Sequence, residues 1–370
     1  MKYSDYINWK TNKPRVVFIV KYFYPTKRIS GILSFLYVLC DFLSKDLDIV
    51  VISAKTSKDE KRLYNHNGYK IIKINKLLYP IESALLTKKI NPDLIFYFSG
   101  IARPILASFY FGLSRFILGK NKKILYCQCT HFFKKPNIIT SWFFNSFDEL
   151  IGTHPNIVKA LQEVTNKPVS FIPPAIDANK LNEVKCKKVR NTYIGFFGHF
   201  HKGKGVDLLI KTFLKLPYEN VKLILGGKDN KFLKSLKPLL NKSNRIKIYN
   251  YMDDIYSLIN LCDFIVLPYR TSAYVLGISQ TLLEAMYLGK PVIGSKTPCL
   301  DIIKSEYNGL IFRNENDLLS KMITLIQDHE LLNMLSINAH KTISENYTIS
   351  LIGKKFLKLI YKKVTKKWMI

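Results

Sequence analysis

A glycine-rich segment at residues 198–205, GHFHKGKG, carries the residue types best suited to hold an anion. It follows an apolar run at 193–197 and precedes 206–213, where apolar residues recur at helical spacing. A glycine loop between a strand and a helix presents backbone N–H groups and the positive end of the helix dipole, and Lys204 adds a full charge. The segment predicts a phosphate site. The alternative is a solvated loop with an unrelated lysine.

The elements that must position this loop follow an α/β pattern. Apolar runs at 16–20, 48–53, 69–74, 92–99 and 123–129 alternate with helical patterns at 32–43, 82–89, 102–118, 139–147 and 156–164. A second series of strands is predicted at 193–197, 221–225, 245–248, 264–267 and 291–294, with helices between them. Alternating strands and helices are typical of parallel sheets covered on both faces.

The length and the charge balance narrow the class of protein. The chain has 370 residues, which favours two domains, and 57 Lys and Arg residues against 27 acidic ones give a formal net charge of +30. Nucleic acid, an anionic membrane face and a polyphosphate ligand all fit this charge, although lysine bias also arises from genome composition or a hot habitat.

The predicted domain boundaries follow the composition. We expect an N-terminal Rossmann-like domain at 1–172, a linker at 173–191 that begins with Pro173 and Pro174 and becomes lysine-rich, and a C-terminal Rossmann-like domain at 192–345. A basic helix is expected in the tail at 346–370, with lysines among apolar residues.

Targeting signals and disulfides are not expected. The polar first fifteen residues do not resemble a signal peptide, and no uncharged apolar run reaches the roughly 18 residues needed to span a bilayer. Six cysteines without paired spacing predict free thiols in a reducing compartment. These features predict a cytoplasmic location.

Several motifs in order resemble the family-4-type glycosyltransferases of glycosyl transferases group 1. The segment 198–210, GHFHKGKGVDLLI, is similar to the family's donor loop, and 282–295, LLEAMYLGKPVIGS, to its E-A-M-x-x-G-x-P-V-I segment. FIPPAID at 171–177, LILGG at 223–227, DFIVLPY at 263–269 and NGLIF at 308–312 complete the set. The resemblance implies the GT-B fold, two Rossmann-like domains facing across a cleft, with the last helix packed back on the N-terminal domain.

The resemblance also implies roles for single residues. Lys204 would bind the diphosphate of a sugar nucleotide and act in catalysis, and Glu284 would accept hydrogen bonds from the ribose hydroxyls, as carboxylates do in dinucleotide sites. Ser279 is expected to cap the helix at 279–288, whose first N–H groups would face phosphate. An exposed helix carboxylate is the alternative for Glu284. The predicted donor-binding residues are Gly198, His199, Lys204, Gly205, Gly277, Ser279, Gln280, Thr281 and Glu284.

Two positions depart from the family pattern. Leu276 stands where the family has a glutamate that touches the donor sugar, and His199 stands where it has an arginine after the first glycine. Leucine accepts no hydrogen bond from a sugar, and histidine delivers less charge than arginine near neutral pH. His199 is therefore interpreted either as a phosphate ligand or as loop filler.

The N-terminal half contributes its own candidates. The segment 127–133, CQCTHFF, is similar to the family's histidine segment after a strand, so His131 is expected in the cleft near the reacting sugar. Strand alternation places Cys127, Cys129 and His131 on one face, which leaves a zinc site as an alternative without an evident fourth ligand. Gly31 matches the acceptor loop, with a simple turn glycine as the alternative.

These features together predict a retaining glycosyltransferase that moves a hexose or N-acetylhexosamine from a nucleotide diphosphate sugar to an acceptor hydroxyl, without a metal or other cofactor. A lipid-linked glycan or surface polysaccharide is the leading acceptor hypothesis, and the seven tail lysines suggest peripheral attachment to anionic membranes. The main alternative is a catalytically weak nucleotide-sugar-binding subunit. A glycosyl phosphorylase would need a cofactor lysine, and no nucleic-acid partner is expected because no binding module is recognised.

Overall fold

The computed structural model describes residues 12–25, 30–57, 60–101, 103–119, 122–132, 137–184, 191–228, 230–250, 255–272, 275 and 277–364. The chain divides into two compact units. Unit 1 runs to Ala175 and takes in Gly277 and the chain from Ile349 onward, while unit 2 runs from Ile176 to Ser272 and from Ile278 to Thr348. The first residues, Cys186 and the last residues of the tail lie outside the described part of the chain.

Unit 1 is built on a sheet of eight described strands in the order β3-β4-β2-β1-β5-β6-β7-β8. All neighbours pair in parallel except β3 and β4, which are antiparallel. The central strands are almost wholly apolar and buried, as expected for a sheet covered on both faces. The strands are β1 (Arg15–Val20), β2 (Asp48–Ala54), β3 (Leu63–His66), β4 (Tyr69–Ile74), β5 (Leu94–Ser99), β6 (Ile124–Gln128), β7 (Glu149–Gly152) and β8 (Val169–Phe171).

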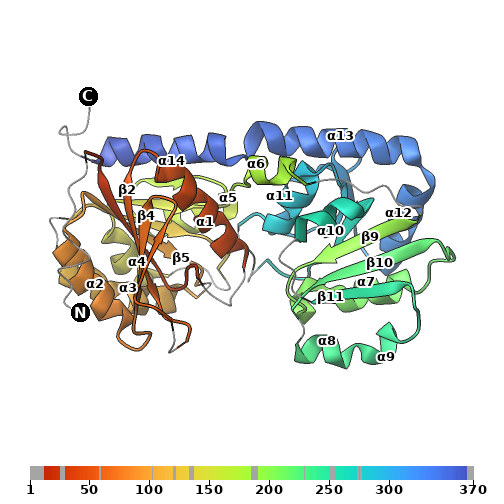
Figure 1. Ribbon diagram of the computed structural model, residues 1–370, viewed down its shortest axis with the longest axis horizontal. Helices are drawn as coiled ribbons and strands as arrows, with labels where there is room; N and C mark the ends of the chain where they lie inside the picture. Colours follow the sequence, from red (N-terminus) through yellow and green to blue (C-terminus); the bar gives the residue numbers. More distant parts are fainter. Residues whose placement is uncertain are drawn as a thin grey trace. The chain divides into compact units, whose positions relative to one another are not determined.

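Helices cover both faces of this sheet (Figure 1). One face packs against α1 (Gly31–Leu43) and α14 (Ile349–Lys363), which contact each other. The opposite face packs against α2 (Tyr79–Ile90), α3 (Pro104–Leu118), α4 (Ile138–Asn145) and α5 (Pro155–Gln162). The two cores divide the strand residues by alternation, so Val16 and Phe18 face α1 while Val17 and Ile19 face the other layer.

Unit 2 contains a parallel sheet of six described strands in the order β11-β10-β9-β12-β13-β14. The strands are β9 (Thr192–Phe197), β10 (Val221–Gly227), β11 (Ile246–Asn250), β12 (Phe264–Leu267), β13 (Val292–Ser295) and β14 (Gly309–Phe312). The helices are α6 (Ala178–Asn182), α7 (Val206–Phe213), α8 (Lys231–Ser235), α9 (Lys237–Leu240), α10 (Ile255–Leu261), α11 (Gln280–Tyr287), α12 (Glu315–Gln327) and α13 (His329–Asn346), with short 3-10 turns η2 (Lys202–Lys204) and η3 (Pro298–Leu300).

Each sheet has a point where the strand order reverses. In unit 2 the chain moves outward from β9 to β10 and β11, then returns to the other side of β9 with β12. In unit 1 the same reversal lies between β1 and β5. Ligands of open α/β sheets bind outside the carboxyl ends of the strands at such a point, so the loops after β9 and β12 define where a site is expected in unit 2.

The predicted domain boundaries need correction. The division falls between Ala175 and Ile176 instead of across a linker at 173–191, because Ile176 pairs with Thr348 in a β-bridge and the Asp177 side chain caps α6. Residues 185–190 of the predicted linker lie outside the described part. Unit 2 therefore starts before residue 192 and continues past 345.

The basic tail forms α14 from Ile349, three residues after the predicted start of the tail segment. Its apolar side is buried against unit 1, with Ile352, Phe356 and Ile360 in the same core as α1. Lys354 and Lys358 of this helix are exposed, while Lys363 forms an ion pair with Glu149 at 2.8 Å. Among the described residues no helix combines the length and the apolar character that crossing a bilayer requires.

Candidate functional site

The glycine-rich loop of unit 2 has the backbone geometry that its sequence predicts. It leaves β9 at Gly198, whose φ of 145° is unfavourable for other residues, and whose N–H donates to the Gly226 carbonyl of β10. The chain then makes the 3-10 turn η2, which the His201 ring caps through Nδ1. Gly205 ends this turn in a left-handed conformation and is at once the N-cap of α7. The loop therefore delivers Lys204 directly at the start of a helix.

The segment after β12 holds this loop in place. A Cβ on Gly205 would lie 1.9 Å from the Pro268 carbonyl oxygen, so only glycine fits there. The Arg270 backbone N–H donates to Gly203, and its guanidinium donates to the Lys202 carbonyl and forms a two-pronged ion pair with Asp207, at 2.7 and 3.0 Å. Burial alone would raise the pKa of Asp207, but the hydrogen bonds and charge of Arg270 outweigh it and hold that pKa below its usual value.

Lys204 lies against an aromatic ring at the reversal point of the sheet. Its Nζ is 3.6 Å from the centre of the Tyr269 ring, a cation–π contact, and Tyr269 is itself buried just after β12. The Tyr269 hydroxyl is 3.3 Å from Ser279 Oγ at the start of α11, and the Tyr269 carbonyl accepts from Ser295 Oγ at the end of β13. Tyr269 thus links the lysine of one segment to the helix start of the other.

The start of α11 differs from the prediction at Ser279. Its side chain makes no capping bond, because Oγ pairs with Tyr269, and its N–H donates to the Cys299 carbonyl at 2.9 Å. Ser279 therefore offers no free N–H group to a phosphate, contrary to the sequence prediction. The first helical residues are Gln280 and Thr281, and the Thr281 hydroxyl donates to the Phe197 carbonyl at the end of β9.

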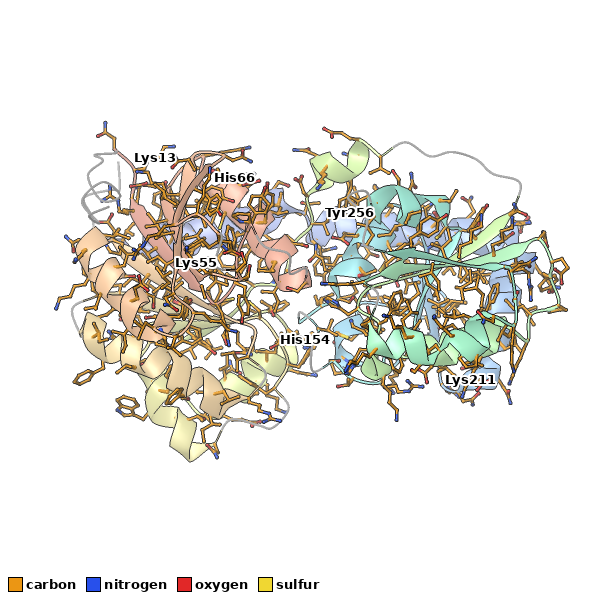
Figure 2. The ribbon with its side chains drawn as sticks, turned by 60° about the horizontal axis from the view of Figure 1, so that its bottom comes forward. Lys13, Lys55, His66, His154, Lys211 and Tyr256 are labelled. Carbon is orange, nitrogen blue, oxygen red and sulfur yellow. The ribbon has the colours of Figure 1, made fainter. Side chains whose placement is uncertain are left out.

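Glu284 is a buried carboxyl, not the exposed helix carboxylate that was its alternative. It is 8% exposed and lies one turn into α11. Burial raises its pKa to about 7, although hydrogen bonds from Gln280 and Tyr256 and the charge of Lys180 act in the opposite direction. The Tyr256 hydroxyl, on α10, is 3.4 Å from Glu284 Oε1, and Figure 2 locates Tyr256 in unit 2. Such a carboxyl changes its ionisation near neutral pH.

Of the two positions that depart from the family pattern, the structure describes only His199. The His199 side chain is exposed, in the loop directly after Gly198. Whether His199 binds phosphate or only fills the loop stays a prediction. Leu276 lies outside the described residues.

In unit 1, His131 follows β6 and is 9% exposed. Its Nε2 lies 2.9 Å from the Gly277 carbonyl, which only accepts, so Nε2 carries the proton in this contact. The Gly277 N–H donates to the Cys129 carbonyl, and a Cβ on Gly277 would be 2.5 Å from Thr153. The N–H and the carbonyl of Gly277 are therefore both hydrogen-bonded, and they hold this residue beside His131. Gly277 precedes Ser279 by two residues in the sequence.

The ring of His154 lies 4.6 Å from that of His131, and Figure 2 locates His154 in unit 1. His154 Nδ1 accepts the Asn156 N–H at the start of α5, so this histidine caps a helix. Gly31 is the first residue of α1 and is preceded by Ser30, whose side chain caps that helix. The structure brings His131 and Gly277 together. Gly31 remains a candidate on its position alone.

The alternative of a zinc site finds no support in the described residues. Cys127 and Cys129 are buried, with their Sγ atoms 4.0 Å apart. Burial raises the pKa of the Cys127 thiol, which disfavours the thiolate that zinc binds. No group of three or more His, Cys, Asp or Glu side chains with the geometry for a metal occurs in the part of the chain that the structure describes.

Sequence reasoning missed four side chains around Lys204 and Glu284. Tyr269 closes the DFIVLPY motif, and an aromatic residue directly after a strand at the reversal point was the signal that was available for it. The pairing of Asp207 with Arg270 joins residues 63 positions apart and leaves no local pattern. Tyr256 likewise reaches Glu284 from a separate helix.

The comparisons with solved structures identify the fold. Sucrose-phosphate synthase from Thermosynechococcus elongatus superposes with a TM-score of 0.77 at 15% identity, covering 95% of this chain and 99% of that one. Anabaena Alr3699/HepE, solved in complex with UDP and glucose, gives 0.74 at 17% identity, covering 94% and 100%. At these identities the likeness shows the fold, and the predicted GT-B fold is confirmed.

The sequence comparisons find similarity to known glycosyltransferases. Uncharacterized glycosyltransferase MJ1069 from Methanocaldococcus jannaschii is 22% identical over 398 aligned positions, covering 94% of this chain and 98% of that protein. The family model of glycosyl transferases group 1 matches residues 177–342, which include the loop, Tyr269 and α11. The narrower family-4 assignment stays a prediction. Residues 177–342 of this chain are therefore similar to the glycosyl transferases group 1 family.

Proposed function

We propose that the protein is a retaining glycosyltransferase that moves a hexose or N-acetylhexosamine from a nucleotide diphosphate sugar to an acceptor hydroxyl. The observation that carries the proposal is the position of Lys204: its ammonium lies against Tyr269, which also contacts the start of α11, at the carboxyl ends of β9 and β12. A cation and a helix start at the reversal point of a parallel sheet form a site suited to a diphosphate.

The chemistry follows from where charge develops. The bond between the anomeric carbon and the diphosphate oxygen breaks, and negative charge grows on the departing diphosphate. Lys204 and the first N–H groups of α11 attract that charge more strongly as it grows, so they lower the barrier selectively. The acceptor oxygen then bonds to the anomeric carbon on the same face, and its proton passes to the departing diphosphate. No protein nucleophile and no metal enter this scheme.

Glu284 is proposed to hold the ribose of the donor. Its ionised carboxylate accepts hydrogen bonds from the two ribose hydroxyls, while the Tyr256 hydroxyl at 3.4 Å supports one oxygen. Burial raises the pKa of Glu284 to about 7 in the free protein. A ribose that donates two hydrogen bonds to this side chain favours its ionised form, so binding of the nucleotide lowers the pKa of Glu284. The solved relative with UDP and glucose supports a nucleotide-sugar donor for this chain as well.

The experiment is a donor screen with the purified full chain. Nucleoside diphosphate release is measured with each common nucleotide sugar, with and without a lipid-phosphate-linked sugar acceptor, and the anomeric configuration of the product is read by NMR. We expect acceptor-dependent release with retained configuration. Slow donor hydrolysis alone would instead make the chain a nucleotide-sugar-binding relative, and inversion would contradict the same-face scheme. A requirement for free phosphate would indicate a phosphorylase.

A further inference from the structure

The outer side of α3 in unit 1 is apolar where a surface helix is normally polar. Phe111, Ser114 and Leu118 face the core, whereas Ile105, Phe109, Leu113 and Phe116 recur at helical spacing on the exposed side. Phe109 is 78% exposed and Phe116 is 81% exposed. Large aromatic side chains that are exposed along one face of a helix indicate that this face contacts another apolar surface or a lipid phase.

The same surface continues onto the neighbouring helices. Exposed apolar residues on α2 and in the turn before it include Leu77, Ile81 and Leu85, again at helical spacing. Ser114 of α3 donates to the Pro80 carbonyl of α2 at 2.7 Å, so the two helices are in contact, and Figure 1 shows them on the same side of the sheet. Trp142 on α4, which contacts α3, is 72% exposed. We call these exposed side chains of α2, α3 and α4 the apolar surface of unit 1.

The charges around this surface are positive. Between residues 76 and 122 the only acidic residues in the sequence are Glu82 and Asp93. Glu82 is paired with Arg62 at 2.6 Å, and Asp93 accepts the Arg15 backbone N–H. Exposed basic residues in the same stretch include Lys88, Lys89 and Arg103. An apolar surface flanked by lysine and arginine complements an anionic lipid bilayer, whereas two copies of it would repel each other.

Within its described residues, the tail helix α14 presents no comparable exposed apolar side. The apolar residues that alternate with lysines along α14 lie in or against the core of unit 1, so they are not available to insert into lipid. Lysines alone give only electrostatic attraction, which salt screens. The element that combines exposed aromatic residues with basic neighbours is α3, not α14.

We propose that the apolar surface of unit 1 is the membrane-contact surface of this protein, and that it lies in the headgroup region of a bilayer rich in anionic phospholipid. Phe109, Phe116 and Trp142 enter the boundary between headgroups and acyl chains, and Lys88, Lys89 and Arg103 meet the lipid phosphates. Aromatic side chains favour the boundary between the lipid headgroups and the acyl chains, where one side is apolar and the other is hydrated. The inference goes beyond the donor chemistry, because lipid binding needs no nucleotide sugar.

The test is co-sedimentation of the full chain with vesicles of phosphatidylcholine, with or without phosphatidylglycerol. We expect binding to the anionic vesicles that falls at least about tenfold in the double variant Phe109→Ser with Phe116→Ser. The matched control is Met334→Ser with Ile337→Ser on α13, which also removes two exposed apolar side chains and should leave binding unchanged. An unchanged thermal unfolding midpoint in both variants shows that each is folded.

Two further measurements decide between this surface and the others. The substitutions Trp9→Phe and Trp368→Phe leave Trp142 as the only tryptophan, whose emission should shift to the blue on anionic vesicles. Lys354→Gln with Lys358→Gln on α14 should have a smaller effect than the aromatic variant. The proposal is wrong if wild type does not sediment, if the tail variant alone loses binding, or if the aromatic variant abolishes a dimer in solution without changing lipid binding. Nucleotide binding measured without vesicles reports separately on the proposed function.

Discussion

The carboxyl ends of the two sheets differ in how they hold their candidate residues. In unit 2 a half-buried cation, Lys204, stands beside a helix start, and the loop that carries it is fixed by Gly205 against Pro268 and by Arg270. In unit 1 the candidate is His131, a buried side chain whose proton is engaged by the Gly277 carbonyl. The comparison teaches that charge stabilisation is built into unit 2, while His131 offers one directed hydrogen bond.

The largest effect is expected at Lys204. Lys204→Ala removes charge that becomes more useful as the diphosphate departs, so turnover should fall roughly 100-fold or more, with a smaller loss of donor affinity. Lys211→Ala, an exposed lysine on α7 (Figure 2), removes the same charge away from the loop and should leave both values near wild type. Steady-state kinetics on the two variants measures the split. Equal losses of turnover in the two variants would show that Lys204 has no specific role in catalysis.

Glu284 is expected to act on binding and to make it depend on pH. Glu284→Gln keeps the shape but weakens the ribose contact, at a cost of roughly 1 to 3 kcal/mol in nucleotide binding. If the ionised form binds, wild-type affinity should rise about tenfold between pH 6 and pH 8, because the pKa of the free site is about 7. Titration calorimetry across this range should give a flat profile for Glu284→Gln, and a flat wild-type profile would contradict the assignment.

The same carboxyl predicts an effect on stability with a definite sign. Its folded pKa of about 7 is above its ordinary value of 4.5, so the folded state holds the proton more tightly than the unfolded chain. The corresponding stability is present below about pH 4.5 and is lost as the pH rises through about 7. Denaturant unfolding should therefore show the wild type losing stability relative to Glu284→Gln across this window. A constant difference between the two would indicate that Glu284 is not buried as a protonated acid.

The contribution of His131 is expected to be that of one neutral hydrogen bond. His131→Ala removes the donor to Gly277, and a bond of this kind contributes about 1 kcal/mol, so turnover should fall roughly 5- to 10-fold. His131→Gln retains a donor and should recover part of the loss. A loss as large as that of Lys204→Ala would show that His131 touches developing charge, and would erase the contrast between the two sheets.

The smallest effect is expected for Tyr269→Phe, because Tyr269 is a positioning residue. Tyr269→Phe keeps the ring under Lys204 and loses only the contact with Ser279, so turnover should change less than threefold or so. Tyr269→Leu loses the ring contact and should lower turnover by about tenfold while donor affinity changes less. Kinetics on both variants, with the unfolding midpoint as a check on folding, separates the ring from the hydroxyl. Equal effects of Phe and Leu would show that the cation–π contact does not orient Lys204.

The sequence predicted the local features of this molecule better than the distant ones. The glycine loop, the helix at α11 and ten strands follow from period and turn residues in short stretches. The strands β3, β7, β8 and β14 were missed; each has only three or four residues, and of the strands that short only β12 and β13 were predicted. Gly205 was found as part of a motif, but its fit against Pro268 comes from a residue far along the chain.

The error at the start of α11 has a physical cause that lies outside the local sequence. Ser279 was expected to offer its N–H to phosphate, but the carbonyl of Cys299, twenty residues later, accepts it. The tail helix, by contrast, was expected to pack back on the N-terminal domain, and its apolar side does complete the core of unit 1. At Ser279 a distant segment uses a group that the local pattern leaves free.

The central claim is that Lys204 and the start of α11 form a diphosphate site, and ligand-induced stabilisation tests it most directly. Thermal unfolding of the full chain is followed with a nucleoside, its monophosphate and its diphosphate at equal concentrations, for wild type and Lys204→Ala. A ligand that binds only the folded state raises the unfolding midpoint with its affinity. We predict that the diphosphate raises the midpoint more than the monophosphate in wild type, and that Lys204→Ala removes most of this difference. Equal shifts for all three ligands in wild type would contradict the account.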